Sequence, residues 1–169
     1  MGNVIRGGAE ELHLSNGGTE VLVEVLMLAA STLAAREWEF RFAALLALQD
    51  QHVMGRGAVG FDLADIDWGG HPAERTGNRD AVLRVADLAL ARHRWDELGY
   101  DPPRTPEYLR RFRSMVAKFD LATPVNDPPE FPRPGDVLLA GCPRHRLLTP
   151  LPWYPACVRC GAEPRDGRH

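Results

Sequence analysis

The stretch TPEYLRRFRSMVAKF, residues 105–119, decides the fold class. Thr105 suits an N-cap, Pro106 suits the first helical position, and Glu107 places an acid in the first turn. The apolar side chains that follow keep the spacing of one helix face: Tyr108, Leu109, Phe112, Met115, Val116 and Phe119. This spacing predicts an amphipathic helix with its apolar stripe turned to a core.

Three further segments also have helical patterns. The strongly apolar residues 19–33 begin at Thr19, which suits an N-cap, and residues 36–52 repeat the helical spacing. These two segments form either one helix or a pair. A third segment starts at Asn78 or Asp80 and runs to about residue 98. The sequence therefore predicts a mainly α protein, a bundle of about four helices.

The segment between Gly55 and Gly77 breaks the helical spacing. Apolar residues alternate there with Asp62, Asp65 and Asp67, which predicts a short strand or an ordered loop inserted in the bundle.

The remaining boundaries follow from glycines and prolines. Two Gly-Gly pairs precede residue 19, and five prolines lie in residues 123–134, where they forbid a regular helix. After the prolines, Asp136 to Ala140 has the pattern of a short strand. The predicted divisions are a flexible N-terminal segment 1–18, a helical domain 19–122, a Pro-rich linker 123–135 and a tail 136–169.

All three cysteines lie in that tail, in two pairs of donors with two-residue gaps: Cys142-Pro-Arg-His145 and Cys157-Val-Arg-Cys160. A two-residue gap lets both donors of a pair face one ion while the backbone folds over them. Two such pairs supply the tetrahedral set of nitrogen and sulfur ligands that zinc prefers. The tail is therefore predicted to hold one structural zinc ion, without which it should unfold while the helical body survives.

The pattern resembles the paired knuckles of zinc ribbons, with His145 at a position where that family usually has cysteine. The resemblance covers residues 136–161 only, and no family is recognised for the whole chain. It implies a closed structural site on a small β-hairpin and nothing about the helical body.

Other uses of the cysteines remain open. Cys157 and Cys160 have the spacing of a redox pair, although that would leave Cys142 without a partner. A catalytic zinc ion needs an open coordination position and a nearby base, whereas two complete pairs close the shell.

Composition limits the class of protein. The chain has 169 residues, 44% of them hydrophobic, and a net charge of −3, which fits one ordinary domain with a small appendage. Glu24 and Arg36 bracket the longest apolar run, and the sequence has no secretory signal, so we expect a cytoplasmic protein with no membrane partner. Lys118 is the only lysine among the 20 basic residues, a bias typical of a GC-rich bacterial genome.

Two groups of residues are candidates for binding a partner. Trp153 and Tyr154 lie among prolines between the two knuckles, a composition typical of interface anchors; docking of the tail on the helices is the other interpretation of these residues. Arg110, Arg111 and Arg113 belong to a basic stretch that contrasts with the acidic N-terminal half. An ordinary solvated helix face explains that stretch equally well.

We therefore expect a non-catalytic protein-binding module, an adaptor or a toxin-neutralising (immunity-type) protein, stabilised by structural zinc. The first alternative is a nucleic-acid-binding regulator that uses the tail arginines with Trp153 and Tyr154. The second is a metal-dependent enzyme that uses Asp62, Asp65 and Asp67. The chain has no Walker loop and no dinucleotide fingerprint, so no enzyme class is favoured.

Overall fold

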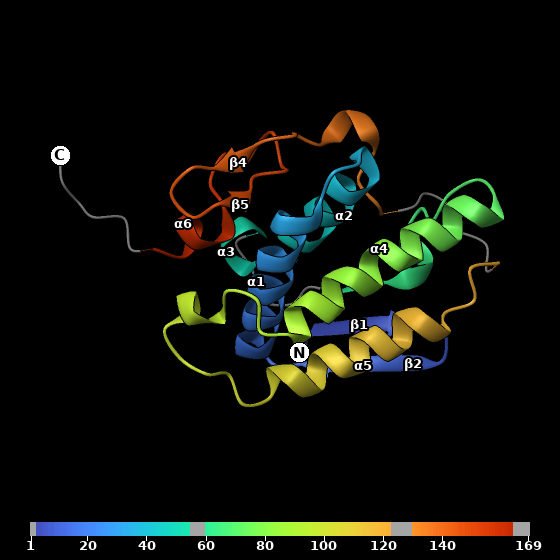
Figure 1. Ribbon diagram of the computed structural model, residues 1–169, viewed down its shortest axis with the longest axis horizontal. Helices are drawn as coiled ribbons and strands as arrows, with labels where there is room; N and C mark the ends of the chain where they lie inside the picture. Colours follow the sequence, from blue (N-terminus) through green and yellow to red (C-terminus); the bar gives the residue numbers. More distant parts are fainter. Residues whose placement is uncertain (1–2, 55–59, 123–129, 164–169) are drawn as a thin grey trace.

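Helices dominate the computed structural model, which describes residues 3–54, 60–122 and 130–163 (Figure 1). The helices are α1 (Asn16–Leu33), α2 (Glu37–Ala47), α3 (Gln51–Met54), α4 (Pro72–Leu90), α5 (Thr105–Lys118) and α6 (Val158–Ala162). Single 3-10 turns are η1 (Leu63–Asp65), η2 (Trp95–Leu98) and η3 (Pro134–Asp136). The strands are β1 (Asn3–Gly7), β2 (Glu10–Leu14), β3 (Gly60–Asp62), β4 (Gly141–Cys142) and β5 (Leu147–Leu148). The mainly α prediction is confirmed, and small sheets accompany the helices.

Helix α1 lies at the centre of the fold. Every residue from Val25 to Ala30 is buried, so its apolar surface extends around the whole helix and needs neighbours on every side. Those neighbours are α2, α4, α5, β2 and β5. Figure 1 shows α1 passing between the tail and the α4–α5 pair.

The start of α1 differs from the prediction. Its N-cap is Ser15, whose Oγ accepts a hydrogen bond from the Gly18 amide at 3.0 Å, so the two glycines lie in the first turn. Thr19 is instead buried, where its hydroxyl accepts a 2.7 Å hydrogen bond from Asn3. The cap offsets the weak helix propensity of glycine and moves the boundary towards the N-terminus.

Residues 19–53, for which one helix or a pair was expected, are divided among α1, α2 and the short α3. Helix α1 ends at Leu33, and α2 starts again at Glu37 with Glu39 accepting a 2.8 Å hydrogen bond from the Arg36 amide. This contact is half of a capping box, which satisfies amides that a new helix leaves without partners.

The expectation of a flexible segment for residues 1–18 is wrong for residues 3–14. Strands β1 and β2 form an antiparallel hairpin in which Ile5, Leu12 and Leu14 are buried. These residues alternate with exposed ones at a period of two, and Gly8 turns the chain at φ +64°. Gly8 makes a tight turn, so the segment is an ordered hairpin and not a flexible lead-in. The hairpin contributes its buried apolar side chains to the main core.

Strand β3 completes the sheet and is the short strand that was one of two forms expected between Gly55 and Gly77, although α4 begins inside that interval at Pro72. The strand order is β2-β1-β3, and β3 runs parallel to β1. Helix α5 contacts β1 and β2, and its Phe112 meets Phe61 of β3 edge to face. The apolar stripe predicted for residues 105–119 therefore packs on this sheet and on α4.

The tail packs on the helical body. Strand β5 contacts α1, α6 contacts α3, and the buried Leu147, Cys157 and Val158 belong to the main hydrophobic core. The expected strand at Asp136–Ala140 is wrong, since η3 ends at Asp136, residues 137–140 belong to no strand, and the strand is Gly141–Cys142.

The second half of the expected Pro-rich linker is anchored. Phe131 is 4% exposed, its ring centroid lies 5.5 Å from that of Trp38, and the Arg41 guanidinium lies 4.7 Å above the ring. Residues 123–129 of that prediction lie outside the described part of the chain. In the described part, no helix has the length and apolarity needed to cross a membrane.

Gly60 offers a test of the sheet. A Cβ at this position would lie 2.0 Å from the Val4 carbonyl oxygen, so Gly60→Ala must push β3 away from β1. We expect it to lower the free energy of unfolding by about 2 to 3 kcal/mol. Urea denaturation followed by circular dichroism measures this change.

The matched control is Gly77→Ala, because a Cβ at Gly77 in α4 meets no atom within 4 Å. This change should stabilise the protein by about 0.5 to 1 kcal/mol through helix propensity. Equal effects of the two substitutions would contradict the close approach of β3 to β1.

Candidate metal centre

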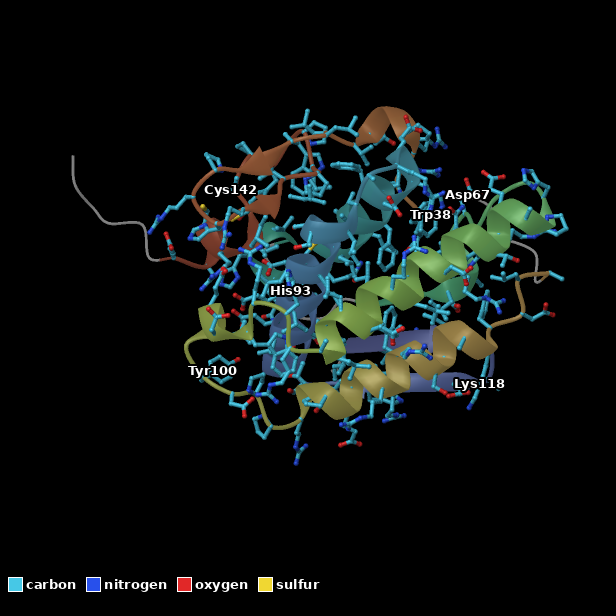
Figure 2. All side chains as sticks on the ribbon, in the orientation of Figure 1. Trp38, Asp67, His93, Tyr100, Lys118 and Cys142 are labelled. Carbon is cyan, nitrogen blue, oxygen red and sulfur yellow. The ribbon has the colours of Figure 1, made fainter. Side chains whose placement is uncertain are left out.

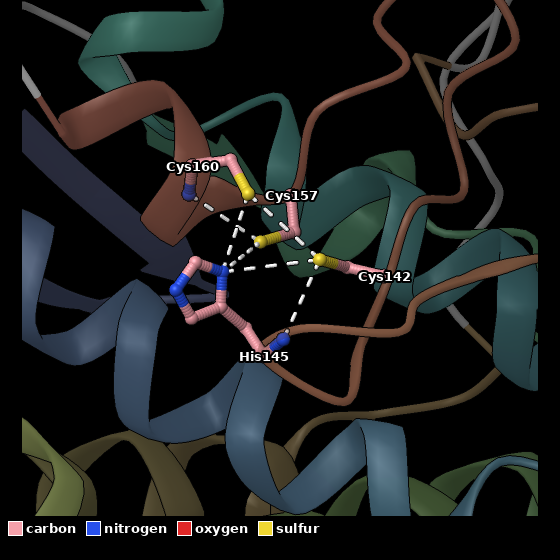
Figure 3. A group of neighbouring side chains, drawn as sticks. All are labelled: Cys142, His145, Cys157 and Cys160. Atoms are coloured by element: carbon pink, nitrogen blue, oxygen red, sulfur yellow. Dashed lines mark hydrogen bonds between the residues drawn. The ribbon is translucent and has the colours of Figure 1, made fainter. Parts of the chain in front are cut away.

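The donors of the two predicted pairs meet in one place. The ligand atoms of Cys142, His145, Cys157 and Cys160 all lie within 4.8 Å of one another. His145 Nδ1 is 3.8 Å from the Cys142 sulfur, 3.3 Å from that of Cys157 and 3.2 Å from that of Cys160. Figure 3 shows this nitrogen facing the three sulfurs. The four residues are close enough to hold one metal ion.

The spacing of the donors fits a tetrahedral ion. With metal–sulfur bonds of about 2.3 Å and a metal–nitrogen bond of about 2.0 Å, a tetrahedron has sulfur–sulfur edges of about 3.8 Å and sulfur–nitrogen edges of about 3.5 Å. The Cys142 and Cys160 sulfurs are 3.8 Å apart, and the sulfur–nitrogen distances scatter around the second value. The donor set is compatible with zinc.

The first pair lies on the β4–β5 hairpin. Cys142 ends β4, and its carbonyl oxygen accepts a 2.8 Å hydrogen bond from the Arg146 amide, which closes the turn. Arg146 has φ +52°, and the His145 amide approaches the Cys142 sulfur at 3.5 Å. The turn therefore directs both donors to one side, as the two-residue gap predicted.

The second pair begins a helix instead of a second strand turn. Cys157 is the N-cap of α6, and its sulfur accepts from the Cys160 amide at 3.4 Å. The expected β-hairpin is thus present at the first pair, while the second pair belongs to a short helix. A helix N-cap and a ribbon knuckle use the same hydrogen bond from residue i+3 to residue i, so spacing alone did not distinguish them.

The surroundings of the thiols differ from one another. Burial raises the pKa of the Cys157 thiol to about 12. Burial also acts to raise the pKa of Cys142, but the amides of His145 and Arg144 lead the contacts that bring it below its ordinary value. Metal binding requires thiolates, so an ion at this site must displace the Cys157 proton.

One carboxylate contacts the far side of the histidine ring. Glu163 Oε1 lies 3.2 Å from His145 Nε2, and Glu163 Oε2 accepts a 2.7 Å hydrogen bond from Arg144. No pattern in the sequence marks Glu163 as a site residue. Its only signal was an acid three residues after the last cysteine.

A second group, formed by Arg94, Glu97, Arg146 and Arg159, fixes the knuckles to the body. Arg94 donates to the carbonyl oxygens of His145 at 2.6 Å and Arg146 at 3.1 Å. Glu97 accepts from Arg94 at 2.8 and 2.9 Å, from Arg146 at 3.0 Å and from Arg159 at 3.4 Å. These contacts join η2 to both pairs of metal donors, and no sequence pattern indicated them.

The two aromatic candidates separate in the structure. Tyr154 is half-buried, and a Cβ on Gly161 of α6 would lie 2.3 Å from the Tyr154 hydroxyl. Tyr154 therefore docks the loop on α6, which is the structural role left open for it. Trp153 is 59% exposed, although it contacts the Tyr154 ring edge to face.

The remaining candidates lie away from the centre. Arg113 binds Asp87, and Arg111 donates to the Glu11 carbonyl oxygen, so these two predicted partner-binding residues support the packing of α5. Arg110 is exposed on the same helix.

The aspartates of the alternative enzyme site serve local structure. Asp62 caps η1, and Asp67 accepts from Arg41 at 3.1 Å. Among the described residues, the four tail donors are the only group of three or more such side chains that could hold a metal ion. Figure 2 shows Asp67 beside Trp38, far from Cys142. These aspartates do not gather into a metal site.

Comparison of the chain with protein-family models, with curated proteins and with solved structures finds no match.

Glu97→Gln tests the contact between η2 and the knuckles. The charge-assisted hydrogen bonds from Arg94, together with the nearby Arg146 and Arg159, hold the pKa of Glu97 below its ordinary value. The substitution should lower the free energy of unfolding by about 1 to 3 kcal/mol at neutral pH. Because the folded pKa is depressed, this contribution is present above the unfolded pKa, about 4.3, and disappears as pH falls through the folded value.

Urea denaturation between pH 7 and pH 3 measures the difference between wild type and variant. Asp96→Asn is the matched control, since Asp96 is the exposed acid next in the chain. The role assigned to Glu97 would be contradicted if both variants lost the same stability, or if the difference persisted unchanged at the lowest pH.

Proposed function

We propose that Cys142, His145, Cys157 and Cys160 hold one structural zinc ion, and that the ion fixes a surface through which the protein binds another protein. Three thiolates and one imidazole are a complete tetrahedral set for zinc and leave no open position for substrate. The proposal is therefore a binding function without catalysis.

The observation that carries the proposal is the position of the exposed apolar side chains. In the described part of the chain, the exposed large hydrophobic residues are Tyr100, Leu138, Leu139 and Trp153. All but Tyr100 belong to the tail. The Leu138 amide donates to the Pro150 carbonyl oxygen at 2.8 Å, so the segments that carry the three tail residues run side by side. Apolar side chains gathered on one exposed region are typical of an interaction surface.

A groove adjoins this surface. Its volume is about 560 Å³, and its lining combines the apolar Leu48, Phe131, Leu151 and Trp153 with the charged Glu130, Arg133 and Asp136. Aromatic anchors of a partner commonly fill depressions at an interface, and tryptophan is enriched among residues that dominate binding energy. The exposed Trp153 ring at the edge of the groove fits that role.

The loop that carries Trp153 is held on both sides. Tyr154 docks on α6, and the Tyr154 amide donates to the Leu151 carbonyl oxygen at 3.1 Å. Pro152 and Pro155 further restrict the backbone. A loop that is ordered before binding loses less conformational entropy when it meets its partner. Adaptor and toxin-neutralising roles would both use a surface of this kind.

The tail arginines that the structure describes favour a protein partner over a nucleic acid, while Arg165 and Arg168 lie outside the described residues. Arg144 pairs with Glu163, Arg146 with Glu97, and Arg159 with both Glu24 and Glu97. Phosphate binding relies on arginines whose charge is available, so paired guanidinium groups weaken that alternative.

Removal of the ion should lower the stability of the whole chain. The tail contributes Leu147 and Val158 to the main core, so we expect one cooperative transition at a lower temperature instead of loss of the tail alone. If the bound ion stabilises the folded chain by about 4 kcal/mol, its loss would lower Tm by roughly 8 to 16 °C. Calorimetry with and without a chelator measures the shift, and elemental analysis should find one zinc per chain.

Cys157→Ser should lose the ion and reproduce the shift without chelator. A wild-type chain that carries no zinc, or a Tm that chelation leaves unchanged, would contradict the zinc proposal.

Photo-crosslinking tests the interaction surface. A photoreactive phenylalanine analogue replaces Trp153, or Leu139 in a second variant, and the full chain is irradiated in the cells that normally express it. We expect a discrete crosslinked protein at both positions, which mass spectrometry identifies. Trp153→Ala should then weaken binding to the identified protein by at least about tenfold, as expected for a central aromatic anchor.

Tyr100 is the matched control position, because it is 55% exposed but lies outside the tail. Equal crosslinking at Tyr100, crosslinking to nucleic acid, or no crosslinking at either tail position would count against the proposed surface.

A further inference from the structure

Glu163 is held at a defined place beside the metal centre. Its amide donates to the Arg159 carbonyl oxygen at 3.2 Å, which makes it the C-cap of α6, the helix that carries Cys160. Its two carboxylate oxygens have separate contacts, one with His145 Nε2 at 3.2 Å and one with Arg144 at 2.7 Å. The carboxylate therefore lies close to the Nε2 edge of the ring, whereas Nδ1 faces the sulfurs.

The imidazole of His145 has to adopt one of two tautomers to bind an ion. A neutral ring binds through the nitrogen that lacks the proton, and the other nitrogen keeps it. Nδ1 faces the three sulfurs, so the proton must be on Nε2. A carboxylate oxygen at 3.2 Å is the acceptor that this N–H requires.

We propose that Glu163 is a positioning residue of the metal centre: with an ion bound, its carboxylate accepts a hydrogen bond from the Nε2–H of His145, fixes the ring, and so presents Nδ1 as the fourth donor. This inference rests on the proposed zinc site. Arg144 in turn orients Glu163, but it is 69% exposed, so its own contribution should be small.

A rival explanation is simple attraction between a carboxylate and a cation. Glu163 also lines an acidic groove of about 280 Å³ with Glu20, Glu24 and Asp50, and all of these charges attract a metal ion. The two explanations differ in their dependence on His145. A field acts on any ion at the centre, whereas positioning acts only through an imidazole ring.

The experiment compares four full-length chains: wild type, Glu163→Gln, His145→Cys and the double variant. Cobalt(II) and zinc affinities are measured by competition with a chelator, and the cobalt absorption bands report the coordination geometry. Glu163→Gln should weaken binding about 10 to 100-fold with histidine at position 145. In the His145→Cys background, where no ring needs orienting, the same substitution should change affinity by less than about threefold, the scale of a minor electrostatic effect.

Glu20→Gln is the matched control, because it removes a carboxylate from the same groove without touching His145. It should leave affinity within about threefold. Nitrogen NMR of the zinc-bound wild type should show the proton of His145 on Nε2, an observation that does not depend on any variant folding.

The outcomes separate this inference from the proposed zinc site. A wild-type chain that binds neither metal overturns the zinc site and the inference with it. If wild type binds and Glu163→Gln binds equally well, or loses the same factor in both backgrounds, only the positioning role is overturned. A proton found on Nδ1 would also overturn it.

Discussion

The fold depends on covering α1 on every side. A helix whose consecutive residues Val25 to Ala30 are all buried is stable only when apolar partners surround it. The sheet and helices α2, α4 and α5 cover most of that surface, and β5 of the tail covers the rest through Leu147. The tail that carries the candidate metal ligands is therefore part of the hydrophobic core, although the prolines before it suggested a separate unit.

The core contact places the metal centre among arginines. A divalent ion with three thiolates and a neutral imidazole would carry one net negative charge. Four arginines contact the backbone and side chains around the four donors: Arg94, Arg144, Arg146 and Arg159. Glu97 binds three of these guanidinium groups and keeps them from repelling one another. Structural strength and charge balance thus come from the same contacts between η2 and the knuckles.

The two aromatic residues in the loop between the donor pairs, Trp153 and Tyr154, have different surroundings. Tyr154 packs against Gly161 and fixes the loop, while Trp153 stays exposed beside the groove. The sequence could not separate these roles, because neighbouring aromatic residues between prolines look alike. Their environments differ because the absence of a side chain at Gly161 of α6 makes room for the Tyr154 ring, whereas the Trp153 ring stays exposed.

The helical class, the apolar stripe of α5 and the four candidate metal donors could be predicted from the sequence, because helical periodicity and a two-residue gap are local geometry. The β1–β2 hairpin could not be predicted from the sequence, because its glycines are also typical of a flexible segment. In the structure the hairpin is part of a sheet in which β3 lies parallel to β1. The contacts of Glu163, Glu97 and Arg94 could not be predicted from the sequence either. These contacts form only when the chain folds, because ion pairs and the approach of a carboxylate to a histidine ring join residues far apart in the chain and leave no periodic pattern.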